Sequence, residues 1–472
     1  MRSDATYPSR QPLQLQRFLR GVFFATAVAC GVFVALWYNR PDLLAIGSFL
    51  SFVPFIFLRN RRSGAPIDFF SPDVGFPLIY IAYLFISTID LPVVSQFNLT
   101  LPWTQWIYYS IGLAAYLLGS ATVCQTVAIT IPLSQPRFWD RSRFGIAVTL
   151  FLAMGLVGRA IKVALYGIPL FHPEEEELRI KYPGGYAGNL AFALEILPIC
   201  LVLYLSVCKP SRRVQLAVAL LILFLIFDAV SGDSRGGVMR IFIASLVTIH
   251  YARSRMRIRS LLLCGLIAVI IASAIGTYRD MSVFGDVNIQ GLESKGYTPY
   301  TLWLGSTYES LRVTTEGFDM LLRHMDRQPY TYGATSLAAL AIPLPGHRPG
   351  PGEIVKKELG FDFIGFGAST TILGPLYMDG GCVAIIIGMM LWGMLAKWLY
   401  VRMIGATNFF WVLTYAYFVQ NQFKAIKDEM FPELGPIFAV LYFAVIHYIS
   451  SGAFRVHWNS FLNSYAARHS EA

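Results

Sequence analysis

Long apolar stretches, separated by short polar segments, recur along almost the whole chain. A helix needs about 20 consecutive apolar residues to cross a bilayer, and about twelve stretches approach that length. The pattern predicts an all-α, polytopic membrane protein with a single transmembrane domain over residues 1–472. The predicted spans are Gly21–Tyr38, Leu43–Leu58, Val74–Leu91, Trp106–Ile131, Phe144–Tyr166, Ala187–Val207, Val214–Val230, Val238–Tyr251, Leu261–Tyr278, Gly374–Tyr400, Phe409–Phe423 and Pro436–Ile449.

Basic residues gather in every second segment between these spans. Because Lys and Arg collect in cytoplasmic loops, the alternation predicts a cytoplasmic (inner) membrane protein with both termini in the cytoplasm. The basic segments hold Arg2, Arg10, Arg17 and Arg20, then Arg59, Arg61 and Arg62, then Arg137, Arg141 and Arg143, then Lys209, Arg212 and Arg213, then Arg253, Arg255, Arg257 and Arg259, and finally Lys397 and Arg402.

One predicted outer segment, residues 279–373 between the ninth and tenth spans, is far longer than the others. Within it, Tyr300–Met325 has the spacing of an amphipathic helix. Ser336–Leu344 is apolar but too short to span, which is typical of a re-entrant or interfacial piece. Ile342–Gly352 is rich in Pro and Gly and predicts a stiff hinge. We therefore expect a large, partly helical loop that folds as a lid on the periplasmic face.

Composition agrees with the membrane interpretation. Charged residues make up 14% of the 472 residues, whereas a soluble domain carries about 25%. A net charge of +10 would suggest nucleic acid in a soluble protein, but here the charges follow the topology, so no nucleic-acid partner is predicted. The six cysteines lie in or beside apolar stretches without a CxxC pair, and no metal or nucleotide motif is apparent. We predict neither a metal nor a cofactor.

Ionisable residues inside the spans share one depth, near the outer ends. Arg159, Glu195, Asp228 and Arg240 lie at this depth, and Arg159 could meet Glu195. Such residues are functional hypotheses in a membrane protein, although long side chains near helix ends also reach water by snorkelling. The inner halves look nearly free of charge. A layer at one depth favours an outward-facing site over a continuous pathway for solutes.

The turn Ser231–Gly237 joins two spans on the predicted outer side and opens a helix. A helix start offers unpaired N–H groups, glycines allow close approach, and Arg235 adds a cation suited to phosphate. The alternative is a tight hairpin with a capping Ser or Asp. Besides Arg235, the candidate cations for binding a diphosphate are Arg159, Arg179, Arg279, Arg312 and Arg348.

Three segments resemble the bacterial oligosaccharide repeat unit polymerases, the Wzy-like O-antigen polymerases. They are Leu165–Phe171 with the following acidic run and Arg179, the turn Ser231–Gly237, and Thr370–Gly381 at the end of the long loop. The resemblance covers residues 144–400. It implies an inverting, metal-independent glycosyltransferase that moves a glycan from a polyprenyl diphosphate donor to a lipid-linked acceptor, with the site on the outer face.

Such a reaction needs fixed positive charge where the diphosphate leaves and a base that takes the acceptor proton. The candidate bases are Glu195, Glu309, Asp280 and His347, which remain unranked. Membrane lipids, a chain-length regulator and a flippase are the further expected partners. Two alternatives stay open: an O-antigen ligase that transfers glycan to lipid A core, and a lipid-linked oligosaccharide flippase or transporter.

Overall fold

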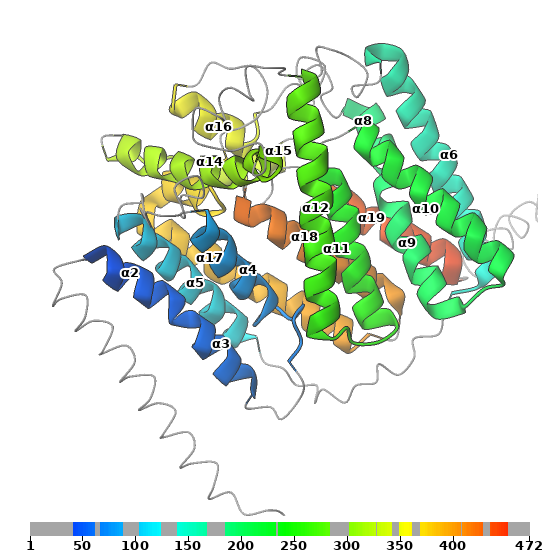
Figure 1. The fold of residues 1–472 in the computed structure, drawn as a ribbon, viewed down its shortest axis with the longest axis horizontal. Coiled ribbons are helices and arrows are strands. Elements are labelled where there is room, and N and C mark those ends of the chain that lie inside the picture. The colour runs from blue at the N-terminus through cyan, green and yellow to red at the C-terminus, as the bar shows by residue number, and fades with distance from the viewer. Residues whose placement is uncertain are drawn as a thin grey trace, which may run out of the picture.

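The computed structural model describes residues 41–61, 67–87, 103–123, 139–167, 185–232, 235–283, 302–326, 328–341, 349–360, 369–406, 408–427 and 435–451. Within these ranges every regular element is a helix (Figure 1). The helices are α2 (Pro41–Leu50), α3 (Phe52–Arg61), α4 (Gly75–Ile86), α5 (Trp103–Thr122), α6 (Arg141–Tyr166), α8 (Gly185–Ala191), α9 (Ala193–Cys208), α10 (Arg212–Gly232), α11 (Arg235–Ala252), α12 (Ile258–Val283), α14 (Leu302–Met325), α15 (Ala334–Ala341), α16 (Pro351–Glu358), α17 (Leu373–Ile404), α18 (Phe409–Lys427) and α19 (Gly435–Ser451).

The predicted spans fall on helices wherever the structure describes them, so the described part of the chain has the all-helical character expected of a helical membrane protein. The first span, Gly21–Tyr38, lies outside the described residues. Arg141–Leu165, Ala187–Cys208 and Leu373–Ile404 are long and apolar enough to cross a membrane, and shorter apolar helices accompany them. The total of twelve spans stays a prediction.

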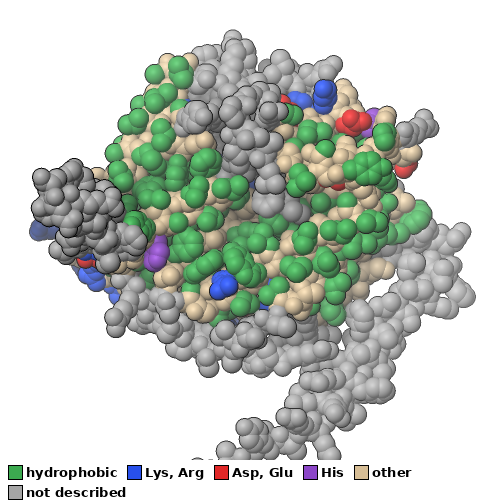
Figure 2. Space-filling model, turned by 180° about the vertical axis from the view of Figure 1, so that it is seen from behind, with side chains coloured by type: hydrophobic (Ala, Val, Ile, Leu, Met, Phe, Trp, Pro, Cys, Tyr) green, Lys and Arg blue, Asp and Glu red, His purple; other side chains and the backbone are tan. Residues whose placement is uncertain are grey.

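The outer surface of the bundle is apolar, as a lipid-facing surface must be. Leu216, Leu220 and Leu223 on α10, and Leu262 and Leu266 on α12, are all more than half exposed. Figure 2 shows hydrophobic side chains over the broad middle of one face, with few charged side chains among them. An apolar surface of this extent would promote aggregation in water but suits the interior of a bilayer.

The centre of the bundle depends on a close contact between α5 and α17. A Cβ atom at Gly119 would lie 1.9 Å from the carbonyl oxygen of Met390, and one at Gly393 would lie 2.1 Å from that of Tyr116. Glycine at both positions lets the two backbones touch, as small residues do between membrane helices. Around this contact the rings of Phe76 and Tyr116 pack 4.3 Å apart.

The tenth predicted span is not one continuous helix. The backbone of α17 leaves helical geometry at Gly380 and Gly381, and Gly381 has a φ of +59°. A side chain there would be strained, and its Cβ would also lie 2.7 Å from the hydroxyl of Tyr330. The sequence prediction missed this break because the surrounding residues are apolar and a Gly pair is common in membrane helices.

The break holds the lid segment in place through Asp379, the residue directly before it. The buried Asp379 carboxylate accepts hydrogen bonds from the Thr331 hydroxyl at 2.6 Å, the Thr335 N–H at 2.9 Å and the Ser336 N–H at 2.8 Å. The last two donors belong to the first turn of α15, which an anion stabilises. Asp379 therefore fastens the start of α15 to the bundle.

The predicted amphipathic helix of the long loop is confirmed as α14. The short apolar segment after it lies partly in α15, and its re-entrant or interfacial character stays a prediction. α14 buries Phe318, Leu321 and Leu322 and lies across the ends of α4, α5 and α17 (Figure 1). The Tyr83 hydroxyl contacts Thr314 Oγ1 at 3.2 Å. We call the end of the bundle that carries α14, α15 and α16 the lid end, and the opposite end, with Arg212, Arg253 and Arg402, the basic end.

We predict that Gly393→Ala destabilises the protein, because its Cβ would push α5 away from α17. Overpacking of this kind costs about 1–3 kcal/mol. The matched control is Gly265→Ala on α12, where nothing lies within 4 Å of the new Cβ. Thermal unfolding of the purified proteins in detergent measures the difference. Equal melting temperatures for the two variants would contradict the proposed packing.

Candidate functional site

Four charged residues from four helices form two ion pairs at the lid end. Arg159 on α6 pairs with Asp228 on α10, with Nε 2.6 Å from Oδ1, and Arg240 on α11 has Nη2 3.5 Å from Oε2 of Glu195 on α9. We call these four residues the lid-end cluster. Their side chains are 13–26% exposed, so the cluster is half-buried.

Small residues bring the helices of the cluster together. A Cβ at Gly155 would lie 2.7 Å from the Leu194 side chain, and one at Gly158 would lie 2.5 Å from the backbone nitrogen of Ala191. Close contact of α6 with α8 and α9 follows from these two glycines. Because Arg159 directly follows Gly158, this contact also fixes the part of the backbone from which the Arg159 side chain extends.

The partner of Arg159 differs from the one that depth suggested. Arg159 contacts Asp228 twice, through Nε to the carboxylate and through Nη2 to the backbone carbonyl, while Glu195 pairs with Arg240. Sequence position sets the depth of a residue in a span. The direction in which it points around the helix axis relative to neighbouring helices is a property of the packed bundle.

The polar residues near the C-terminal end of α18 are buried in the core of the bundle. Gln420, Asn421 and Gln422 are all buried, and Gln422 Nε2 donates to the Tyr116 hydroxyl at 3.0 Å. This bond links α18 to α5. A buried amide of this kind stabilises helix contacts in a membrane protein by roughly 1 kcal/mol.

Two predicted site residues, Glu309 and Arg312, lie on α14 in the lid. Arg312 contacts Glu316 at 3.1 Å and Glu309 at 3.9 Å, which are contacts between successive turns of one helix. Arg235 is the first residue of α11, so the prediction that the Ser231–Gly237 segment opens a helix is confirmed; the helix begins within the segment, and α10 before it continues to Gly232.

The remaining predicted site residues are only partly described. Arg279 and Asp280 belong to the last turns of α12, and their side chains, like that of Arg235, lie outside the described residues. Arg179, His347 and Arg348 lie outside them entirely. Their roles stay predictions.

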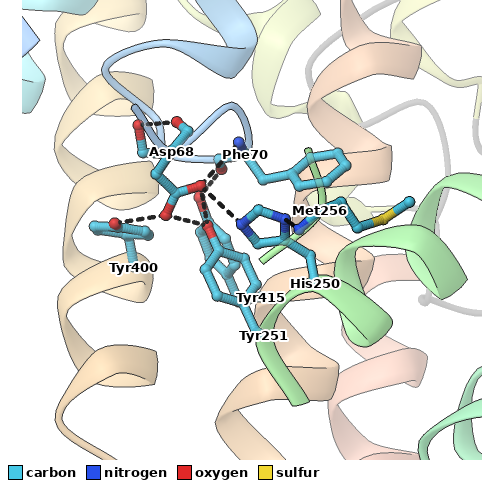
Figure 3. A network of polar contacts seen from close by, with 8 residues as sticks. Asp68, Phe70, His250, Tyr251, Met256, Tyr400 and Tyr415 are labelled. Carbon is cyan, nitrogen blue, oxygen red and sulfur yellow. Dashed lines mark hydrogen bonds and ion pairs between the residues drawn. The ribbon is translucent and has the colours of Figure 1, made fainter. Parts of the chain in front are cut away.

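A second polar network, which the sequence did not single out, lies at the basic end around Asp68 (Figure 3). The Asp68 carboxylate accepts from the hydroxyls of Tyr251 and Tyr400, both at 2.9 Å, and from the Phe70 N–H at 3.1 Å. His250 Nε2 lies 3.3 Å from Oδ1. The residues come from the segment before α4 and from α11 and α17, so the network joins elements far apart in sequence.

The proton on His250 can be assigned from its other neighbour. The Met256 N–H donates to Nδ1 at 3.1 Å, so Nδ1 must carry the lone pair and Nε2 the hydrogen that faces Asp68. Burial raises the pKa of Asp68, but the close contact with His250 and the hydrogen bonds from Tyr251 and Tyr400 outweigh burial and bring the pKa below its usual value. Asp68 is therefore a stable, internally satisfied carboxylate.

A buried ion pair between Asp73 and Lys397 lies at the same end of the bundle. The Ser120 hydroxyl donates to Asp73 at 2.7 Å. The expectation that the inner halves are nearly free of charge is therefore wrong. Lys397 was counted among loop residues, but α17 continues to Ile404, and a lysine can stay inside a helix bundle when a carboxylate faces it.

The two groups of polar residues differ in what they offer a ligand. At the basic end, Asp68 and Asp73 are buried, and each carboxylate is hydrogen-bonded to its own buried partners. Polar networks of this kind typically stabilise a fold. At the lid end, the paired arginines keep part of their surface accessible. Among the described residues, no group of His, Cys, Asp and Glu could hold a metal ion. We take the lid-end cluster as the candidate site.

We predict that Lys397→Met destabilises the protein strongly, since it leaves Asp73 buried without its cation; removing one partner of a buried pair costs about 3–5 kcal/mol. The double variant Asp73→Asn with Lys397→Met removes both charges and is expected to unfold at a higher temperature than the single variant. A double variant no more stable than Lys397→Met would contradict the buried pair.

The comparisons with known proteins agree with the resemblance noted in the sequence. A family model described as "Putative O-antigen polymerase" matches residues 68–422, which is well over half of the chain and includes the lid-end cluster and the Asp68 network. No curated protein and no solved structure matches the chain. The match of the family model shows that the chain belongs to the O-antigen polymerase family.

Proposed function

We propose that this membrane protein joins polyprenyl-diphosphate-linked oligosaccharide repeat units into a longer surface polysaccharide. The family indicates O-antigen polymerase activity and lipid-linked oligosaccharide substrates in general. The observation that supports the finer proposal is the lid-end cluster, in which carboxylates on neighbouring helices hold two arginines, Arg159 and Arg240, in part-exposed positions. A folded segment of helices, α14 to α16, lies at the same end (Figure 1).

The proposed step is one displacement at the anomeric carbon. A hydroxyl group of the acceptor sugar attacks that carbon, the bond from the carbon to the phosphate oxygen breaks, and the diphosphate leaves with the bonding electrons. The hydroxyl proton passes to a carboxylate or imidazole, for which Glu195, Glu309, Asp280 and His347 are the candidates. Since attack and departure occur on opposite faces, the anomeric configuration inverts.

Arginine suits the leaving group in this step. Negative charge grows on the diphosphate as the bond breaks, and fixed donors aimed at that charge lower the barrier. A guanidinium group has five N–H donors, and Arg159 uses Nε and Nη2 on Asp228, so Nη1 takes part in neither contact. The Asp228 carboxylate holds the Arg159 guanidinium group in one orientation. The guanidinium group would therefore need to reorient little when the diphosphate binds.

The remaining parts of the proposal follow from the sequence. Arg235 at the start of α11, with Arg179, Arg279, Arg312 and Arg348, would supply further contacts to the diphosphate or to acidic sugars. A flippase would deliver the substrate, and a chain-length regulator would act on the product. In an O-antigen ligase the same donor site would serve a lipid A core acceptor, so the choice of acceptor in the assay separates the two activities.

We expect Arg159→Gln to lower kcat/KM for polymerisation by about 100-fold, the effect of losing one preorganised donor to a developing anion. Arg159→Lys keeps the positive charge but loses the planar guanidinium with its paired N–H donors. Its kcat/KM should lie between that of Arg159→Gln and that of the unaltered protein. The assay supplies purified protein in lipid with polyprenyl-diphosphate-linked repeat units and follows the initial rate of polymer formation, and the polymer length, on gels.

The matched control for this experiment is Arg323→Gln on α14, whose side chain is 74% exposed and pairs with Asp319. The same substitution there should leave polymer length unchanged. Melting temperatures of all variants show whether the fold survives loss of the Asp228 pair. Arg159→Gln protein that folds and polymerises at the rate of the unaltered protein would refute the proposed role.

We also propose that the lid end faces the periplasm and the basic end the cytoplasm. Gln328 and Ser254 are exposed at opposite ends. With a membrane-impermeant maleimide on cells whose periplasm is accessible, Gln328→Cys should be labelled and Ser254→Cys should not. The unaltered protein gives the background from its native cysteines. Labelling of Ser254→Cys but not of Gln328→Cys would contradict the proposed orientation and indicate the opposite one.

A further inference from the structure

Tyr332 lies in the turn between α14 and α15, and its ring projects almost wholly out of the protein. It is 86% exposed, the highest value among large hydrophobic side chains in the described part of the chain. Aromatic residues on the lipid-facing helices, such as Trp103 and Trp398, are 46% and 41% exposed, so they keep about half of their surface against the protein. The Tyr332 ring, by contrast, has little of its surface packed against the protein.

The backbone holds this ring at a conformational cost. Tyr332 has a φ of +52°, in the left-handed region that residues with a Cβ seldom occupy. Its N–H donates to the Asp379 carbonyl at 3.0 Å, and the Thr331 N–H donates to the Met378 carbonyl at 2.9 Å. The turn is thereby bonded to the break in α17. Strained positions that the surroundings maintain are found preferentially at functional sites.

The residues beside Tyr332 give the turn a particular surface. Tyr330 is 40% exposed, and its hydroxyl lies above Gly381 at the α17 break. Gln328 is exposed as well, while Thr331 points inward to Asp379. We call Gln328, Tyr330 and Tyr332 the aromatic strip. All three are exposed side chains on a turn that is fixed to the bundle through Thr331 and Tyr332.

Sugars are the ligands whose chemistry matches such a strip. A pyranose ring has apolar faces of C–H groups, which an aromatic face attracts through its negative quadrupole, and a rim of hydroxyls, which an amide can bind as donor and acceptor. Tyrosine supplies this contact with little loss of side-chain entropy. A lipid surface would also accept tyrosine, but it has no need of a backbone strained to hold one ring in a fixed place.

We propose that the aromatic strip is a subsite for the glycan of the lipid-linked substrate, in which a sugar remote from the diphosphate stacks on Tyr332. The inference rests on the proposed function for the identity of the ligand. It gives the segment α14–α16 a direct part in substrate binding, because this segment would hold part of the sugar chain.

The test is a titration of purified, full-length protein in lipid nanodiscs with the free repeat-unit oligosaccharide, released from its carrier by mild acid. Tyr332→Gly is the informative variant. Glycine adopts a positive φ without strain, so this variant should melt at the same or a higher temperature. It should nevertheless bind the oligosaccharide about two- to tenfold more weakly, the range for one aromatic contact.

Two further variants separate stacking from anchoring at a lipid surface. Tyr332→Phe keeps the ring and should retain the affinity, whereas Tyr332→Leu keeps apolar area without a ring and should bind as weakly as Tyr332→Gly. Full affinity in the Leu variant, or equal affinities of Tyr332→Gly and the unaltered protein, would overturn the inference. Because the free oligosaccharide carries no diphosphate, the titration is independent of turnover. Failure of the unaltered protein to polymerise lipid-linked units would instead contradict the proposed function.

Discussion

Three ion pairs among the described residues lie within this bundle, and each pair joins different parts of the chain. Arg159 with Asp228 links α6 to α10, Arg240 with Glu195 links α11 to α9, and Lys397 with Asp73 links α17 to the segment before α4. The constraint is physical, because an isolated charge in an apolar interior is too costly to keep. The position of one charge therefore restricts where its partner helix can lie, and the arrangement of the bundle depends on these restrictions.

The same constraint has different consequences at the two ends. At the basic end, Asp68 receives donors from several elements and is closed off from a ligand. At the lid end the pairs are partly exposed, and in the proposed function a diphosphate would share the arginines with their carboxylates.

The lid segment is attached to the bundle at a break in helix α17. Gly380 and Gly381 interrupt α17. Just before the break, the Met378 and Asp379 carbonyls accept from the Thr331 and Tyr332 N–H groups, and the Asp379 carboxylate caps α15. One break thus fixes the start of a lid helix and the turn that carries Tyr332. Broken helices in membrane proteins are tolerated where protein, not lipid, surrounds the irregular backbone, and the lid segment supplies that protein here.

The sequence by itself was sufficient for the class of the protein, the positions of most helices and the amphipathic character of α14. These depend on local hydrophobic patterns, which a bilayer makes unusually strong. It also identified Arg159, Glu195, Asp228 and Arg240 as one layer, because depth follows from position along a span. Only the tertiary structure decided which of them pair, since pairing depends on how each helix is rotated against its neighbours. For the same reason Asp68, Asp73 and Lys397 appeared as ordinary loop residues until long-range packing brought their partners together.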